Sequence, residues 1–143
     1  MASKLSRVKL AVKMITQSKE CIYIQTPYFI PDASFLDACR IALMAGTKIK
    51  LMIPNKPDHM FVYWATYANA AELVRYGAEV FTYEEGFLHA KTLVIDKDVA
   101  QSVIDAFERD EARAERLTIE RYESRTRWIR FKESVSRLLS PIL

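Results

Sequence analysis

The sequence is poor in the residues from which several common kinds of active site are built. Its three glycines lie far apart, so it has no glycine-rich loop to hold a nucleotide phosphate. No serine stands in the pattern of a nucleophile elbow. Its two histidines, His59 and His89, are thirty positions apart, and no cysteine, histidine or carboxylate pair has metal-ligand spacing. We therefore expect neither a metal site nor a bound cofactor.

Cysteine and long apolar runs are scarce as well. Cys21 and Cys39 are the two cysteines, on separate predicted elements, which is too few for a disulfide framework. We expect reduced, buried thiols of a cytosolic protein, and a disulfide is the less favoured alternative. No apolar run has the length of a membrane span, and no signal peptide is recognisable. These absences predict a soluble chain without a transmembrane segment.

The residues that are present suit one folded domain. The chain has 143 residues, half of them hydrophobic, which is enough to build a core. Its net charge of +3 favours an anionic partner without requiring one. Helix-like and strand-like patterns alternate, which predicts an α/β fold with a mixed sheet flanked by helices. The predicted helices are Ser3–Ser18, a segment from Asp32 or Ser34 to Ala45, and Phe61–Tyr76; the predicted strands are Cys21–Thr26, Lys48–Ile53, Ala78–Tyr83 and Leu88–Ile95.

The stretch from Phe87 to Asp96 carries the strongest chemical signal. If it is a strand, His89 and Lys91 point to the same face, because positions two apart share a side. Leu93 and Ile95 continue that face. A nucleophile or acid–base group beside a fixed cation suits chemistry on an anionic centre such as a phosphate. Taken alone, one histidine near one lysine is more often chance or a buried core histidine.

Two further features near the ends of predicted strands bear on a site. Tyr28 and Phe29 lie in a loop between two prolines, after the first predicted strand. They either pack over the sheet edge or form the wall of a site at the strand's carboxyl end, and we weigh the two equally. Lys56, in the turn after the second predicted strand, is interpreted as a solvated lysine rather than a ligand.

The spacing of His89, Lys91 and Asp96 matches the H-x-K-x4-D signature of the phospholipase D superfamily. The stretch from Phe87 to Asp96 resembles the second such motif of bacterial cardiolipin synthases. The segments Gln25–Asp32, Ile53–Asp58 and Tyr67–Tyr76 resemble that family too, so the likeness covers nearly the whole chain. It implies a phospholipase D-like half-domain.

The resemblance also implies an activity, which is transfer of a phosphatidyl group between phospholipids such as phosphatidylglycerol. One motif's histidine would form a phosphohistidine, and the other's would act as general acid and base; His89 could take either role. Lys91 would neutralise phosphoryl charge, and Asp96 would support the geometry of the histidine or the lysine. Family members with one motif per chain dimerise, so a homodimer is possible here. Full-length members sit in the bacterial cytoplasmic membrane, with N-terminal spans and a first motif that are absent from this sequence.

One part of the family pattern is missing after Asp96. The family has a G-[ST]-x-N element and then a further strand at this point, whereas here the chain runs directly into a helix-like segment. We interpret this as an internal deletion, which would remove strands from the sheet and leave an unusual exposed edge. Residues 1–98 would then form the α/β domain and residues 99–143 a helical C-terminal segment.

The C-terminal segment is predicted to be helical from Val99 to Ser140. Trp128, Phe131, Val135 and Leu138 form an apolar stripe at helical spacing, and the arginines and lysines gather in the same stretch. The stripe either docks on the sheet, which we favour, or binds anionic lipid. Two other functions remain open: a catalytically inactive fragment that binds lipid or a partner, and a phosphodiesterase or nuclease of the same superfamily. The basic residues have little aromatic interleaving, which argues against nucleic acid.

Overall fold

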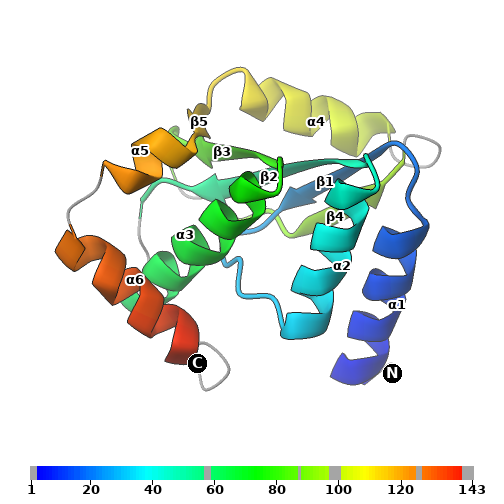
Figure 1. Cartoon of the computed structure of the whole chain (residues 1–143). Coiled ribbons are helices and arrows are strands. Elements are labelled where there is room, and N and C mark those ends of the chain that lie inside the picture. Colours follow the sequence, from blue (N-terminus) through cyan, green and yellow to red (C-terminus); the bar gives the residue numbers. More distant parts are fainter. Residues whose placement is uncertain (1–2, 57–58, 87, 97–100, 125–126, 140–143) are drawn as a thin grey trace.

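The computed structural model describes residues 3–56, 59–86, 88–96, 101–124 and 127–139, and it forms a five-stranded mixed sheet between layers of helices (Figure 1). The strand order is β4-β1-β2-β3-β5. The strands are β1 (Cys21–Gln25), β2 (Lys48–Pro54), β3 (Glu79–Tyr83), β4 (Thr92–Ile95) and β5 (Glu115–Leu117). The helices are α1 (Lys4–Gln17), α2 (Ala33–Met44), α3 (Met60–Arg75), α4 (Gln101–Glu111), α5 (Ile119–Glu123) and α6 (Arg127–Leu139).

The three central strands are parallel, and the two outer strands run against them. β1 pairs with β2, and β2 with β3, in parallel registers. β4 is antiparallel to β1, and β5 is antiparallel to β3. The carboxyl ends of the central strands therefore meet at one edge of the sheet, which we call the carboxyl edge. The predicted α/β class and the pairing of all four predicted strands are confirmed.

The sheet has an apolar core on each face. On one face, α1, α2 and α3 pack around fully buried side chains that include Ile15, Ile49 and Leu73. On the other, α4 packs Ile104 and Phe107 on Tyr23 and Met52 of the sheet. In β4, Leu93 and Ile95 contact the first core and Val94 lies in the second, which confirms the predicted alternation of that strand.

The predicted strand Leu88–Ile95 is too long at its beginning. β4 starts at Thr92, which lies opposite Gln25, the last residue of β1. Pro27 follows two residues later and cannot continue the ladder as a donor. Residues 88–91 consequently pair with none of the described strands, and His89 and Lys91 lie in an irregular segment before β4 rather than within it.

The prediction of helix from Val99 to Ser140 is wrong between α4 and α5. β5 lies there and pairs with the outer edge of β3, so that Leu117 is opposite Val80 and is buried. The charged sequence of β5 hides its strand character, but an open edge of β3 offers hydrogen bonds that a nearby segment can satisfy. Part of the predicted C-terminal segment therefore belongs to the same sheet as residues 21–95. Residues 99 and 100 lie outside the described residues.

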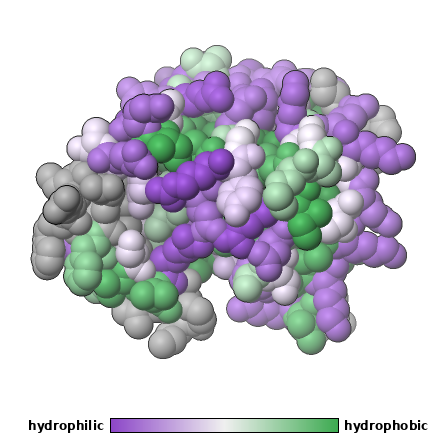
Figure 2. Space-filling view, viewed as in Figure 1, coloured by the Kyte–Doolittle hydropathy of each residue, from purple (hydrophilic) through white to green (hydrophobic). Residues whose placement is uncertain are grey.

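The predicted docking of α6 on the sheet is also wrong. α6 packs against α3, where Lys132 Nζ lies 5.0 Å from the centroid of the Trp64 ring and Arg137 forms an ion pair with Glu72. Two members of the predicted stripe, Phe131 and Leu138, stay 59% and 79% exposed. Figure 2 shows hydrophobic atoms at the surface over this helix, at the lower left. The side chain of Trp128 is outside the description.

The start of α2 and the state of the cysteines follow the sequence. Asp32 caps α2, with its carboxylate accepting a hydrogen bond from the Phe35 N–H at 2.9 Å. Cys21 and Cys39 are buried free thiols, and burial raises the pKa of Cys39 to about 12. Among the helices of the described residues, none combines the length and the apolar character needed to cross a membrane.

Candidate active site at the carboxyl edge

The segment before β4 lies at the carboxyl edge and presents His89 and Lys91 there. Leu88 is buried in the core below α4, whereas His89 and Lys91 are exposed. Leu88 therefore fixes the segment to the core, and the two polar side chains remain open to solvent. A histidine and a lysine two residues apart at the ends of parallel strands occupy the place where ligands of α/β sheets commonly bind.

The loop after β1 supplies an aromatic neighbour for the lysine. Lys91 Nζ lies 5.9 Å from the centroid of the Tyr28 ring, within the range of a cation–π contact. Tyr28 is 38% exposed, but Phe29 is buried and its N–H donates to Thr66 Oγ1 at 3.0 Å. Each of the two alternatives for this loop therefore describes one of its residues: Phe29 packs inward, and Tyr28 borders the site.

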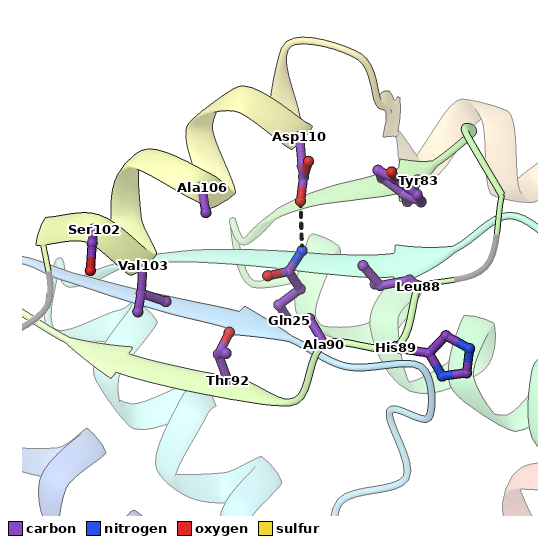
Figure 3. Close-up of a pocket in the computed structure, with 10 residues that line it drawn as sticks. All are labelled: Gln25, Tyr83, Leu88, His89, Ala90, Thr92, Ser102, Val103, Ala106 and Asp110. Carbon is purple, nitrogen blue, oxygen red and sulfur yellow. Dashed lines mark hydrogen bonds between the residues drawn. The ribbon is translucent and has the colours of Figure 1, made fainter.

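A pocket of about 440 Å³ lies between α4 and the segment that carries His89. Gln25, at the end of β1, crosses it and donates from Nε2 to Asp110 Oδ2 at 3.0 Å (Figure 3). His89 stands at the rim, with its ring turned away from this hydrogen bond. Leu88, Ala90 and Ala106 give the pocket apolar walls. Its apolar walls suit an uncharged group next to His89, and Asp110 is the one carboxylate of its lining.

The third predicted site residue, Asp96, lies at the opposite end of β4. Five residues of extended chain separate it from Lys91, which is about 16 Å at the rise of a strand. Asp96 Oδ1 accepts hydrogen bonds from the Ser18 hydroxyl at 2.9 Å and from the N–H groups of Glu20 and Cys21 at 3.0 and 3.2 Å. Its Oδ2 accepts from the Lys19 N–H at 3.1 Å. The structure thus groups His89 with Lys91 and places Asp96 on the loop that enters β1.

These contacts change the acidity of Asp96. Partial burial raises the pKa of its carboxyl, but the hydrogen bonds from Lys19, Glu20, Ser18 and Cys21 outweigh that effect and leave the pKa below its ordinary value. The backbone of Asp96 has φ of 52°, a left-handed conformation that aspartate and asparagine tolerate better than most residues. The charged form therefore ties the end of β4 to the start of β1.

We expect Asp96→Asn to lower the free energy of unfolding by about 1–3 kcal/mol at pH 7, because the amide accepts fewer hydrogen bonds and carries no charge. The pKa is lower in the folded state, so this stabilisation is complete above the unfolded value of about 3.9 and is lost as pH falls through the folded value. Denaturant unfolding at pH 7 and pH 3 measures the difference, which should shrink at pH 3. Asp105→Asn, at an exposed position of α4, is the control; an equal loss in both variants contradicts the assignment.

Several polar residues of this edge escaped the sequence analysis. Glu84 Oε1 accepts from the Thr82 hydroxyl at 3.0 Å and Oε2 from Asn55 Nδ2 at 2.5 Å, which links the ends of β2 and β3. The Gln25–Asp110 pair was missed as well. Gln25 did carry a signal, since it is a polar residue closing an apolar strand; Asp110 carried none. In the described residues, no three histidine, cysteine or acidic side chains are grouped to hold a metal ion.

Comparison with known proteins identifies the family to which the sequence is similar. Residues 11–104 match the family described as the cardiolipin synthase, PLD-like domain. The chain is 45% identical to the major cardiolipin synthase ClsA of Bacillus subtilis, over 92% of this chain and 33% of that protein. It is 46% identical to cardiolipin synthases of Listeria monocytogenes and Staphylococcus aureus, over 92% of this chain in each case. The chain therefore spans about a third of the length of these relatives.

Two solved structures share the fold at low sequence identity. One is Nuc of Salmonella typhimurium, a phospholipase D family member, with a TM-score of 0.66 at 15% identity over 79% of this chain and 91% of that chain. The other is the phosphatidylserine synthase of Haemophilus influenzae, with a TM-score of 0.65 at 12% identity over 99% of this chain and 44% of that chain.

The lengths of the matches also bear on the interpretation of an internal deletion. The match to the Bacillus subtilis protein extends over 160 residues, but 92% of the 143 residues here is only about 132, a difference of about 28. About 28 aligned residues of the relative therefore have no counterpart in this chain, a number that is compatible with the interpretation that a block is missing after Asp96. The match to the family and the identity to its members lead to one conclusion: the chain belongs to the cardiolipin synthase family of phospholipase D-like domains.

Proposed function

We propose that this chain carries one catalytic half-site of a phosphatidyltransferase, which moves a phosphatidyl group from one phospholipid to another. The observation on which the proposal rests is the placement of His89 and Lys91, both exposed, at the carboxyl edge beside a pocket. The names of the relatives, cardiolipin synthases, support phosphatidylglycerol as the substrate class. The pocket's apolar walls and engaged carboxylate suit the uncharged part of an acceptor alcohol rather than a second phosphate.

The proposed reaction has two displacement steps at phosphorus. A histidine nitrogen attacks the phosphorus, the P–N bond forms, and the P–O bond to the leaving alcohol breaks while a second histidine donates a proton to that oxygen. The acceptor hydroxyl then gives its proton to the second histidine and attacks phosphorus, so the P–N bond breaks. His89 performs one of these two roles. Lys91 stabilises the negative charge that builds on the phosphoryl oxygens.

Asp96 and Tyr28 act on this site through other residues. Asp96 fixes the far end of β4 and so sets the position of the segment leading into that strand. Tyr28 limits the positions of the Lys91 ammonium through its ring. Both are positioning residues in the proposal, because neither carries the proton or the phosphoryl group.

The second histidine must come from outside this half-site. The relatives are about three times as long as the part that this chain matches, so one source is another motif in a longer polypeptide. A second copy of the chain in a homodimer is the other source. The lipid substrate places the full-length enzyme at a membrane surface, because phospholipid head groups are presented there.

A second candidate function is a catalytically inactive module that binds lipid or a partner. The difference of about 28 residues between the chain and its relatives favours it, because the missing block includes the G-[ST]-x-N element by the sequence pattern. Both candidate proteins would bind phospholipid at the carboxyl edge, but only the phosphatidyltransferase would turn it over.

Binding at the site can be tested without turnover by NMR of the histidine rings. During titration with a short-chain, water-soluble phosphatidylglycerol, we expect the ring signals of His89 to shift with saturation and those of His59 to stay nearly unchanged. Lys91→Gln should weaken the affinity by about tenfold or more, because a charge-assisted contact to phosphate is lost. Lys56→Gln, at an exposed position of the same edge, is the matched control and should stay within about twofold. Equal shifts at both histidines, or no saturable shift, contradict the proposal.

A further inference from the structure

A phospholipid phosphate can reach His89 only if the carboxyl edge approaches the bilayer. This step rests on the proposed function. The phosphate of a membrane lipid lies at the boundary between water and hydrocarbon, and a protein that takes it up must touch that boundary. The side chains around the edge should therefore combine apolar groups that enter the interface with cations that meet anionic head groups.

We propose that a rim of four aromatic side chains and one methionine (Tyr28, Phe61, Trp64, Phe131 and Met60) docks this chain on an anionic bilayer. Met60 and Phe61 begin α3, six and seven positions after Pro54, the last residue of β2. They are 48% and 46% exposed. Phe61 packs edge-on against Trp64, with ring centroids 5.7 Å apart. The rim therefore starts at the edge that carries His89.

α6 extends the rim along α3. Lys132 Nζ lies 5.0 Å from the Trp64 ring centroid, and the preceding residue, Phe131, is 59% exposed. The ion pair of Arg137 with Glu72 holds α6 on α3, and the Glu72 carboxylate is also paired with Arg40 of α2. Figure 1 shows α6 beside α3, and Figure 2 shows the exposed hydrophobic surface over α6. The helix is thus fixed by its polar contacts while apolar side chains stay at the surface.

The charges of the rim select an anionic surface. Two lysines, Lys91 and Lys132, stand over rings of the rim, at Tyr28 and Trp64. Aromatic rings with neighbouring ammonium groups are typical of protein surfaces at the membrane interface, where each lysine adds attraction to anionic lipid. The sequence of α6 has four basic residues and one acidic residue, which adds to the same attraction.

α1 offers a matched surface at another place. It carries basic residues and two exposed leucines, Leu5 and Leu10, which are 64% and 60% exposed. α1 leads into the amino end of β1, so a bilayer lying on it would not bring a phosphate to the carboxyl edge. The two surfaces are alike in residue composition. They differ in their position relative to His89, and only the rim lies at the carboxyl edge.

Co-sedimentation with vesicles tests the rim. With equimolar phosphatidylglycerol and phosphatidylcholine, we expect binding that weakens with added salt, and with phosphatidylcholine alone much weaker binding. Replacing Phe61 and Phe131 by serine should weaken the partition by about tenfold or more, since two rings no longer leave water. The control, Leu5→Ser with Leu10→Ser, should stay within about twofold. Equal binding to both kinds of vesicle, or an equal loss in the control, overturns the proposal.

A second readout separates this inference from the proposed function. The Phe61 and Phe131 variant should keep the melting temperature within a few degrees and keep the saturable shift of His89 with soluble phosphatidylglycerol. Loss of vesicle binding with that shift retained supports the rim. Normal vesicle binding in this variant overturns the rim and leaves the phosphate site standing. Absence of the shift in the unaltered chain overturns the proposed function instead.

Discussion

A cardiolipin synthase in which the matching third is exchanged for this chain is expected to transfer phosphatidyl groups near the background rate. Inserting the relatives' missing block of about 28 residues after Asp96 should raise the rate by at least about a hundred- to a thousandfold. The rest of the host enzyme supplies the other motif in both proteins, so the comparison isolates the block. Transfer is measured as cardiolipin formed from labelled phosphatidylglycerol.

The size of this effect follows from what the block contains by the family pattern. Its G-[ST]-x-N element would add polar groups near the phosphate, and losing a single preorganised donor costs about a hundred- to a thousandfold in rate. Its strands would also support the segment leading to β4. A scrambled block of equal length is the control and should give no gain. The result could instead be substantial transfer by the exchanged enzyme without the block, and loss of that transfer in His89→Ala. This would show that the site assembles without the block.

The fold could be predicted from the sequence where a pattern is local. The apolar and β-branched runs of Cys21–Gln25 and Lys48–Pro54 have strand periodicity, and prolines and glycines close the elements. β5 could not be predicted, because a charged segment becomes a strand only where β3 offers an open edge. The start of β4 likewise depends on where β1 ends, because it is set by the pairing of the two strands and not by the local sequence of β4.

The candidate site could be predicted in part. The motif spacing singles out His89 and Lys91, and both are exposed in the segment that leads into β4. Asp96 is too far along β4 to touch them, and the length of a strand could have excluded such contact in advance. Tyr28 and Asp110 reach the edge from other elements. Their positions depend on the packing of the β1–α2 loop and of α4, which no spacing shows.

The apolar stripe of α6 shows the limit of helical periodicity. The spacing of Phe131 and Leu138 predicts a common face but does not say what that face contacts. In the structure α6 is held by Lys132 on Trp64 and by Arg137 at Glu72, and both of these charged residues lie outside the apolar stripe. α6 does dock, but on α3 instead of the sheet and with basic side chains at the contact, because long basic side chains can form a packing face.

If His89 is a reacting histidine, His89→Ala should abolish phosphatidyl transfer without unfolding the protein. In the exchanged enzyme with the block restored, we expect transfer to fall by at least about a thousandfold, because either role of His89 is essential to both steps. The melting temperature should stay within a few degrees, since His89 is exposed and outside both cores.

The most direct test is the rate of cardiolipin formation in three forms of that enzyme: unaltered, His89→Ala and His59→Ala. His59 is the chain's other histidine and precedes α3 at the same edge, so it matches the change in residue type and in location. We predict transfer at background for His89→Ala and within about threefold of the unaltered enzyme for His59→Ala, with equal melting temperatures throughout. Retained transfer in folded His89→Ala would show that His89 is not a reacting histidine.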